Sequence, residues 1–220
     1  MSETGQYHYL KQEVARLKQE NAELHEEVGT LRQYVEAIQT LVEAIDHLDP
    51  REEVMRLLDR ILYNALALVN SQDGSLLVTD EETAELVFVL TRGEKQRPLQ
   101  GLRMPINKGI AGWVAHYQQP TIVNNATVDD RFYAGLGGTT SPGTLSILAA
   151  PIVGNGRLLG VLEIVDKRDG KPFNATDQAL VMLLCRFAGQ VLSTILQEEE
   201  GSTTGEAPDY FPPAATWPEG

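Results

Sequence analysis

The chain has 220 residues, of which 42% are hydrophobic, which is enough for one folded domain with extensions and too much for disorder throughout. Its formal net charge of −13 lies mainly in the flanks, because residues 1–49 carry 10 acidic and 4 basic side chains and residues 198–220 carry 6 acidic and no basic ones. No basic face is visible that would neutralise phosphates, which excludes nucleic acid and disfavours anionic membranes as partners.

Residues 1–49 show a heptad repeat that predicts a coiled-coil dimerisation helix. Val predominates at the a positions and Leu at the d positions over about five heptads, a combination that favours two parallel helices. Asn21 falls on an a position, where it pairs best with its own copy and fixes the register. The predicted dimer contacts are Val14, Leu17, Asn21, Leu24, Val28, Leu31, Val35, Ile38, Val42 and Ile45.

The charges beside this apolar stripe favour the same parallel arrangement. In this register Glu13, Glu20 and Glu27 would face Lys18, His25 and Arg32 of a second copy. Each exposed pair contributes only about 0.2–1 kcal/mol, but together the pairs select the orientation. The alternative is an amphipathic helix that packs on its own domain, which would need neither the buried Asn nor the matched charges.

Residues 50–197 predict one α+β domain with a mostly antiparallel sheet of about six strands flanked by helices. Asp49 and Pro50 are typical of a helix start and predict a break after the coil. Helices are expected over residues 50–70, 109–118 and 175–197. Strands are expected over 75–80, 86–91, 102–106, 120–124, 144–153 and 157–167, with turns at 71–74 and 154–156 and an irregular stretch at 125–143.

Several stretches of this domain resemble the GAF family. They are Lys108–Ala115, Gln119–Asn124, Asp129–Phe132, Leu148–Ile152, Gly160–Val165 and Phe173–Asp177. The resemblance covers about residues 50–197 and implies a GAF-like, PAS-related fold. GAF domains bind cyclic nucleotides, tetrapyrroles, small metabolites or nothing known, so the resemblance leaves the cofactor unknown.

The resemblance places a ligand pocket between the sheet and the segment spanning about residues 109–145. Polar and aromatic side chains that would line it are Asn124, Asn125, Asp130, Phe132, Tyr133, Thr144 and Ser146, with Glu163 on the facing strand. An aromatic ring with a few directed donors and acceptors suits a small planar ligand. The alternative is that Phe132 fills the core and the Asn residues cap turns. The Gly- and Thr-rich residues 135–141 are either a lid or a plain flexible loop.

Cyclic-nucleotide-binding members of the family carry an Asn-Lys, Phe and Asp-Glu motif. The matching positions here read Asp166-Lys167, Phe173 and Asp177-Gln178, so three of the five residues agree. An ion pair between Lys167 and Asp177 would tie the last strand to the last helix. This bracing is structural even in the family, so the partial match favours cyclic nucleotides only modestly.

Enzymatic and metal chemistry find little support in the sequence. Cys185 is the only cysteine, lies within an apolar helical stripe and is expected to be a small buried hydrophobe. His116 is the only histidine outside the coil, so no metal cluster is expected, and haem ligation by it is a weak alternative. The single cysteine, the polar residues 1–20 and the lack of about 18 consecutive apolar residues predict a cytoplasmic chain.

Residues 198–220 form an acidic tail that is expected to be disordered. Its end places Tyr210, Phe211 and Trp217 among prolines, which is typical of a peptide that docks on a partner. The alternative is a tail without a role, or one that lies on its own domain.

Together these features predict a non-enzymatic, dimeric sensory protein. Its GAF-like domain would bind a small molecule and signal in trans to a protein partner, reached through the coil or the tail. The alternative is a scaffold or self-assembling adaptor, with possible higher assembly, in which the GAF-like domain is structural.

Overall fold

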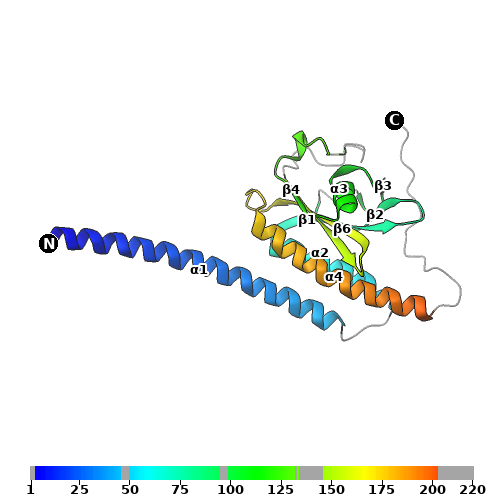
Figure 1. The fold of residues 1–220 in the computed structure, drawn as a ribbon, viewed down its shortest axis with the longest axis horizontal. Coiled ribbons are helices and arrows are strands. Elements are labelled where there is room, and N and C mark those ends of the chain that lie inside the picture. Colours follow the sequence, from blue (N-terminus) through cyan, green and yellow to red (C-terminus); the bar gives the residue numbers. More distant parts are fainter. Residues whose placement is uncertain (1–2, 46–49, 95–98, 132, 134–145, 203–220) are drawn as a thin grey trace. The chain divides into compact units, whose positions relative to one another are not determined.

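The computed structural model describes residues 3–45, 50–94, 99–131, 133 and 146–202 (Figure 1). The chain forms two compact units, one within Met1–Gln39 and one within Thr40–Gly220. The described part of the first unit lies within helix α1 (Glu3–Ile45), which agrees with the predicted coiled-coil segment. The a and d side chains from Leu10 to Val35, apart from Asn21, form an apolar stripe with exposed fractions of 45% to 57%. Such a stripe is consistent with a coiled coil, because a second helix is what would cover it.

The charged residues of α1 also pair within the helix. Arg16 contacts Glu13 at 2.6 Å and Glu20 at 3.2 Å, and all three side chains are exposed. Two of the three glutamates expected to face a second copy therefore have an alternative partner one turn away. The side chains of Val42 and Ile45 lie outside the described part of the chain.

Helix α2 (Pro50–Leu68) follows within the second unit and starts at the expected proline. Its expected apolar stripe is buried in full, at Val54, Leu57, Leu58, Ile61, Leu62, Ala65 and Leu68. The helix ends where Asn70 adopts a left-handed conformation with φ of 54°, a region that Asn tolerates better than most residues. The chain then enters the sheet directly.

The sheet has six antiparallel strands in the order β3-β2-β1-β6-β5-β4. Their bounds are β1 (Ser71–Asp80), β2 (Glu85–Arg92), β3 (Arg103–Pro105), β4 (Thr121–Val123), β5 (Ile147–Gly154) and β6 (Arg157–Lys167). The expected turn between β5 and β6 is confirmed, because Asn155 and Gly156 form a two-residue loop with φ of 50° and 78°.

The expectation of a turn at residues 71–74 is wrong, because these residues begin β1 and pair with β6. Ser71 donates its hydroxyl to the carbonyl of Val165 at 2.8 Å, so its polarity serves the sheet. A Cβ on Gly74 would lie 2.9 Å from the side chain of Leu66, so the glycine permits α2 to approach the strand closely. Both residue types that suggested a turn are used inside the strand.

Helices cover both faces of the sheet (Figure 1). Helices α2 and α4 (Ala175–Ser202) pack on one face and on each other. Helix α3 (Gly109–Tyr117) lies against β5 and β6 on the other face, and a short 3-10 helix, η2 (Ala126–Val128), follows β4. Helix α4 runs past the expected boundary at residue 197 to Ser202. Its only cysteine, Cys185, is fully buried as expected, and burial raises the pKa of the thiol to about 12.

Helix α4 crosses β5 where Gly189 of the helix meets Gly154 of the strand. A Cβ on Gly189 would lie 2.6 Å from the carbonyl carbon of Val153, and one on Gly154 would collide with Ser193 and with the backbone of Gly189. The hydroxyl of Ser193 turns back to the carbonyl of Gly189 at 2.7 Å. Backbone therefore lies against backbone at this crossing, and no larger residue fits there.

Candidate functional site

The face of the sheet that α3 covers is mostly apolar. Its buried cluster joins Leu77, Phe88, Ile110, Val114, Ile147, Ala149, Val161 and Val165 with smaller neighbours. One row of residues across the three central strands is polar instead. Thr91 on β2 lies opposite Ser75 on β1, which lies opposite Glu163 on β6. Since neighbouring strands are about 4.8 Å apart, this polar row spans about 10 Å of an otherwise apolar surface.

Glu163 is the charged member of the polar row. It keeps some accessible surface, but its carboxyl is enclosed by protein, and this burial raises its pKa to about 7. The backbone N–H of Ala111 donates to the carboxyl and opposes that rise. Ala111 lies in the first turn of α3, where N–H groups have no partner within the helix and attract negative charge. The side chain therefore connects the central strand to the start of α3.

The other two members of the polar row are hydroxyls. Ser75 is fully buried, and the hydroxyl oxygen of Thr91 is buried without a hydrogen-bond partner among the described residues. A buried polar atom without a partner costs about 1–3 kcal/mol, so it needs an explanation. A bound molecule or water contacting this row would supply the missing partner.

Glu163→Gln is expected to change how stability depends on pH. The carboxyl pKa is raised from its ordinary 4.5 to about 7, so the stabilisation present below about pH 4.5 is lost as the pH rises through 7. Over this interval the free energy of unfolding of the wild type should fall by up to about 3 kcal/mol more than that of the variant. Urea unfolding of both proteins at about pH 5 and pH 8 measures the difference. Equal losses in the two proteins would contradict the burial of this carboxyl.

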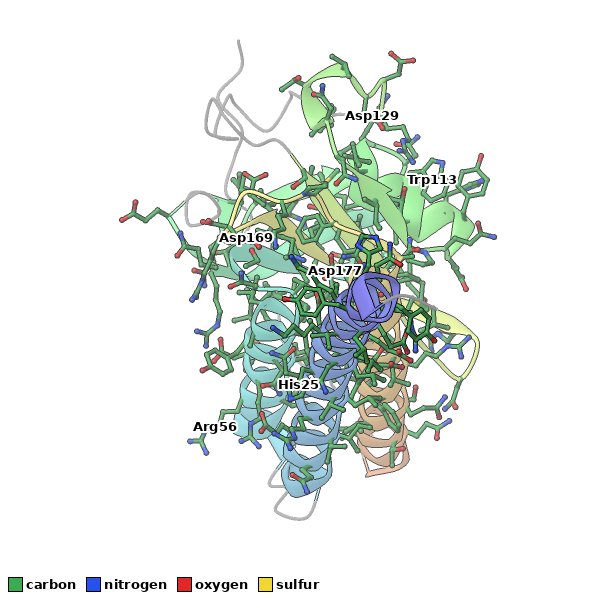
Figure 2. The ribbon with its side chains drawn as sticks, turned by 90° about the vertical axis from the view of Figure 1, so that its left-hand side faces the viewer. His25, Arg56, Trp113, Asp129, Asp169 and Asp177 are labelled. Atoms are coloured by element: carbon green, nitrogen blue, oxygen red, sulfur yellow. The ribbon has the colours of Figure 1, made fainter. Side chains whose placement is uncertain are left out.

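An open groove of about 540 Å³ begins at the start of α3. It is lined on one side by Lys108, Gly109, Trp113 and Tyr117 and on the other by Arg131 and Tyr133. Figure 2 shows Trp113 and Asp129 on the side of the sheet away from α2 and α4. The groove thus combines two cations with aromatic rings beside the helix start that Glu163 contacts.

Arg131 is held in place at this groove. Its guanidinium lies 4.9 Å from the ring centre of Trp113 and makes two hydrogen bonds of 2.8 Å to the Asp129 carboxylate. These bonds lower the pKa of Asp129 below its ordinary value and raise that of Arg131. The guanidinium is therefore held rigidly between the ring and the carboxylate, and the Asp129 carboxylate balances its charge.

The two asparagines predicted to contact a ligand have structural partners. The side-chain amide of Asn124 donates to the carbonyl of Phe173 at 3.2 Å and accepts from its N–H at 3.0 Å. Asn125 precedes η2 and accepts the hydroxyl of Thr127 at 2.8 Å. Both side chains therefore stabilise connections, which is the alternative interpretation of their sequence.

The remaining predicted ligand residues are distributed differently. Asp130 is exposed at the groove, and Tyr133 lines the groove while packing on the apolar cluster. Ser146 is buried and donates both its N–H, at 2.7 Å, and its hydroxyl, at 3.2 Å, to Asp166. Phe132 and Thr144 lie outside the described residues, as does the 135–141 segment. Among these eight predicted residues, Glu163, Asp130 and Tyr133 lie at the polar row or the groove.

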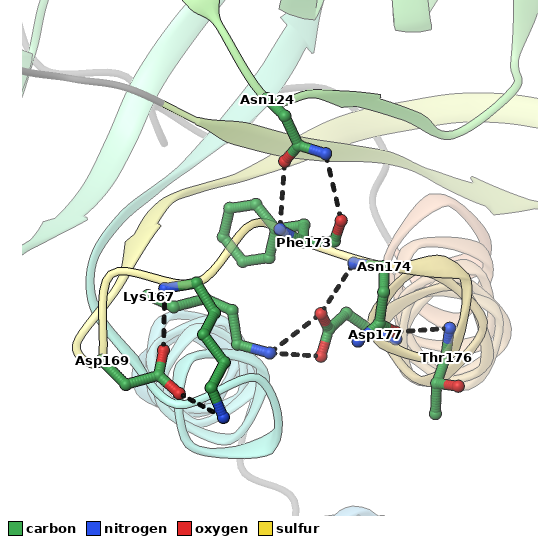
Figure 3. A network of polar contacts seen from close by, with 8 residues as sticks. Asn124, Lys167, Asp169, Phe173, Asn174, Thr176 and Asp177 are labelled. Carbon is green, nitrogen blue, oxygen red and sulfur yellow. Dashed lines mark hydrogen bonds and ion pairs between the residues drawn. The ribbon is translucent and has the colours of Figure 1, made fainter.

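The ion pair expected between Lys167 and Asp177 is present and almost fully buried (Figure 3). The ammonium lies 3.0 Å from each oxygen of the carboxylate, which also accepts the N–H of Asn174 at 2.9 Å. Asn174 in turn accepts the N–H groups of Thr176 and Asp177, which caps the start of α4. Together with the bonds from Asn124 to Phe173, this network fixes the connection from β6 to α4.

The other functional groups of the described residues do not gather into a metal site. Within the described part of the chain, no three His, Cys, Asp or Glu side chains are placed to hold a metal ion. His116 is exposed and stacks edge-on against Tyr117. One described helix, Ala175–Gln197 within α4, is long and apolar enough to cross a membrane, but half of this stretch is buried inside the domain.

A six-stranded antiparallel sheet with helices on both faces defines a domain of the α+β class. Residues 53–192 match the family model described as GAF domain, and the chain belongs to the GAF family. The GAF domain of a phosphoenolpyruvate-protein phosphotransferase from Coxiella burnetii has the same fold, with a TM-score of 0.62 at 18% identity over 78% of this chain and 98% of that one.

Two curated relatives are cyclic-nucleotide phosphodiesterases. The probable 3',5'-cyclic phosphodiesterase pde-5 of Caenorhabditis elegans is 28% identical over 142 residues, which cover 60% of this chain and 19% of that protein. The dual 3',5'-cyclic-AMP and -GMP phosphodiesterase 11 of Drosophila melanogaster is 27% identical over 151 residues, which cover 62% and 10%. The chain therefore spans about a fifth or less of the length of these relatives.

Proposed function

We propose that this chain is a dimeric cytoplasmic regulator whose GAF domain binds a small molecule between the sheet and α3 and signals to a partner protein. The observation that carries the proposal is the polar row of Thr91, Ser75 and Glu163 on an apolar, helix-covered face. An enclosed carboxyl with one backbone partner and a buried hydroxyl without a partner are costly in such a place. A ligand that contacts both would offset their cost.

Cyclic nucleotides are the first ligand class to test. The two phosphodiesterase relatives are named for these molecules, and the partly matching Lys167 and Asp177 motif favours the same class. The groove beside α3, whose lining contains none of the polar row, is a second place to look for a ligand, with aromatic rings for a base and Lys108 for a phosphate. Asp166 and Gln178 depart from the cyclic-nucleotide motif, so the screen also includes other small metabolites.

A thermal-shift screen of the purified chain against cyclic nucleotides and small metabolites tests the binding function. A ligand that binds only the folded state raises the temperature of the unfolding midpoint. At a ligand concentration of a hundred times its dissociation constant, it adds about 2.7 kcal/mol to the free energy of unfolding. Calorimetry on each hit should give a saturable isotherm that Glu163→Ala weakens. No hit, together with an experimental structure in which side chains fill the space over the polar row, would exclude the proposal.

The dimer is proposed from the exposed stripe on α1. Seven apolar a and d side chains between Leu10 and Val35 are about half exposed and follow one stripe of that helix. Covering them with a second copy removes this surface from water at roughly 25 cal/mol per Å². A parallel pairing also places the Asn21 side chains of the two copies together.

Leu24→Asp combined with Leu31→Asp is expected to convert the dimer to a monomer. Two buried carboxylates per helix in a two-helix seam have no cation to pair with, so they oppose association. Light scattering after size exclusion should show half the mass of the wild type. The matched control is Gln19→Asp with Gln33→Asp, which adds the same charges away from the seam and should stay dimeric. Equal masses for the two double variants would contradict a seam along this stripe.

Signalling would require that the ligand prefer one of two arrangements of the domain. The site lies on the α3 face, and α2 and α4 lie on the opposite face of the same sheet. Strand β6 contributes residues to both faces of the sheet, because Glu163 lies at the site and Lys167 holds the start of α4. A tilt of α3 on ligand binding would therefore reach the helices through this strand.

A scaffold function is the alternative, and one surface favours it. On α4 an open groove of about 600 Å³ is lined by Met182, Leu183, Arg186 and Phe187, and Phe187 is 41% exposed. Contacts between such grooves would extend a coiled-coil dimer to larger assemblies. Light scattering separates the two functions, since a mass that grows with concentration supports assembly and a fixed dimer supports the regulator.

A further inference from the structure

Helix α4 carries an apolar groove that no described segment of the chain fills. The groove has a volume of about 600 Å³ and lies between α4 and β5. Its apolar lining consists of Pro151, Val153, Met182, Leu183 and Phe187. Phe187 is 41% exposed, although it is a large apolar side chain. Strand β4 pairs with β5 only over Ile147–Ala149, so among the described residues no strand covers the rest of that edge. An exposed apolar surface of this kind is typical of a binding surface.

One cation lies at this groove without a counter-ion among the described residues. Arg186 is exposed, lines the groove and directly precedes Phe187. The two other polar residues of the lining, Gln118 and Gln190, are uncharged. The groove therefore combines apolar side chains with one free positive charge, which suits an apolar segment that carries an acid.

The acidic tail that follows α4 has this composition. Residues 203–220 contain three acidic side chains and no basic one. Asp209 is followed at once by Tyr210 and Phe211, and prolines stand on both sides of these three residues. Proline restricts the backbone to extended conformations, which lowers the entropy lost when a segment is bound. The tail therefore offers an acid and two aromatic rings in the order that the groove requires.

The length of the tail matches the distance back to the groove. At about 1.5 Å per helical residue, positions 182–187 of α4 lie about 22–30 Å before Ser202. At about 3.3 Å per extended residue, positions 209–211 reach about 23–30 Å beyond Ser202. A tail that turns back at Ser202 and follows the helix therefore brings Asp209 to Arg186.

The stretch between Ser202 and the groove is matched as well. The exposed side chains on that face of α4 are the polar Gln190, Thr194 and Gln197. The tail residues that would cover them, 203–207, read Thr-Thr-Gly-Glu-Ala and contain no large apolar side chain. Helix face and tail therefore change from polar to apolar at the same distance from Ser202.

We propose that residues 208–213 of this chain dock in its own α4 groove and run antiparallel to the helix. Asp209 then lies beside Arg186, and the two aromatic rings that follow it pack on Phe187. Burial of the rings is the larger gain, since an exposed ion pair contributes little. A second copy or a partner protein that uses this groove must first displace the tail, so the tail controls access to it.

A fluorescent peptide of residues 203–220 tests the proposal by anisotropy titration with the full chain. Tyr210→Ser combined with Phe211→Ser, called the opened variant, removes the rings that occupy the groove in the wild type. At an effective concentration on the order of 1 mM, a tail whose free peptide has a dissociation constant of about 0.1 mM leaves about a tenth of the wild-type grooves open. The peptide should therefore bind the opened variant about tenfold more tightly than the wild type.

Matched variants locate the contact on both sides. Trp217→Ser also removes an aromatic ring from the tail, but residue 217 reaches about 50 Å beyond Ser202, which is past the start of α4 at about 40 Å. This variant should bind the peptide as weakly as the wild type. Arg186→Glu, added to the opened variant, should weaken the peptide about tenfold. Lys171→Glu makes the same change of charge at an exposed position outside the groove and should have no effect.

Three results would overturn the proposal. Equal affinities of the wild type and the opened variant would show that the tail does not occupy the groove of its own chain. A peptide that does not bind the opened variant would show that the groove does not accept the tail, and a mass that grows with concentration in light scattering would then identify a second copy as the occupant. Binding that survives Arg186→Glu would place the peptide elsewhere. None of these results depends on the ligand site under α3.

Discussion

Gly189→Val is expected to lower the free energy of unfolding by about 4 kcal/mol, which is a large part of the stability of an ordinary domain. A Cβ at this position would lie 2.6 Å from the carbonyl carbon of Val153 and 3.1 Å from its nitrogen. The obstacle is the backbone of β5, which cannot rotate away as a side chain can. Helix α4 would have to separate from the sheet along its length, which opens the core it covers.

The matched control for this prediction is Gln190→Val on the same helix. Gln190 is exposed, so the change costs only the lower helix propensity of valine, about half a kcal/mol. Urea unfolding followed by circular dichroism measures both variants. A loss below about 1 kcal/mol for Gly189→Val would show that α4 and β5 are not in backbone contact.

Asp177→Ala is expected to lower the free energy of unfolding by about 3–5 kcal/mol. Only 8% of the Asp177 side chain and 12% of the Lys167 side chain is exposed, so the variant leaves a buried ammonium without a counter-ion. The N–H of Asn174 also loses its acceptor at 2.9 Å. The connection that fixes the start of α4 would loosen at two points.

Two comparison variants identify the cause of that loss. Asp169→Ala removes a carboxylate that pairs with the exposed Lys171 at 3.5 Å and acts on Lys167 through its charge without a hydrogen bond, and surface pairs of this kind contribute about 0–1 kcal/mol. Lys167→Met combined with Asp177→Leu removes both buried charges and should recover much of the stability lost by Asp177→Ala. A double variant less stable than the single one would show that the charges themselves stabilise the fold.

Much of the fold could be predicted because its signals are local. The heptads between Val14 and Val35 predict one long helix, and the apolar spacing of α2 predicts the face that is buried. The hairpin at Asn155 and Gly156 follows from the left-handed conformation that these residues tolerate. The change from helical to strand-like spacing along the chain then predicted the order of the elements, and the family resemblance agreed with it. The predicted turn at residues 71–74 was wrong because the close packing of α2 on Gly74 is not visible in the local sequence.

The site was harder to predict because it depends on register. Glu163 stands out in the sequence as an acid within an apolar strand, and it lies at the site. Ser75 and Thr91 were missed, since only the pairing of β1 with β2 and β6 places them in one row with it. The polarity of Asn124 and Asn125 was visible, but their bonds to Phe173 and Thr127 depend on contacts that the sequence does not display.

The central position of β1 beside β6 has a consequence for how the domain is joined to other segments. Ser71 at the start of β1 lies opposite Lys167 at the end of β6. Helix α2 therefore ends, and helix α4 begins, near the same ends of these two strands. The two helices pack together and run in opposite directions, so the beginning of α2 and the end of α4 also share one end of the domain. Entry and exit points that lie together let such a domain be inserted into a longer chain, or duplicated in tandem, without rearranging its core.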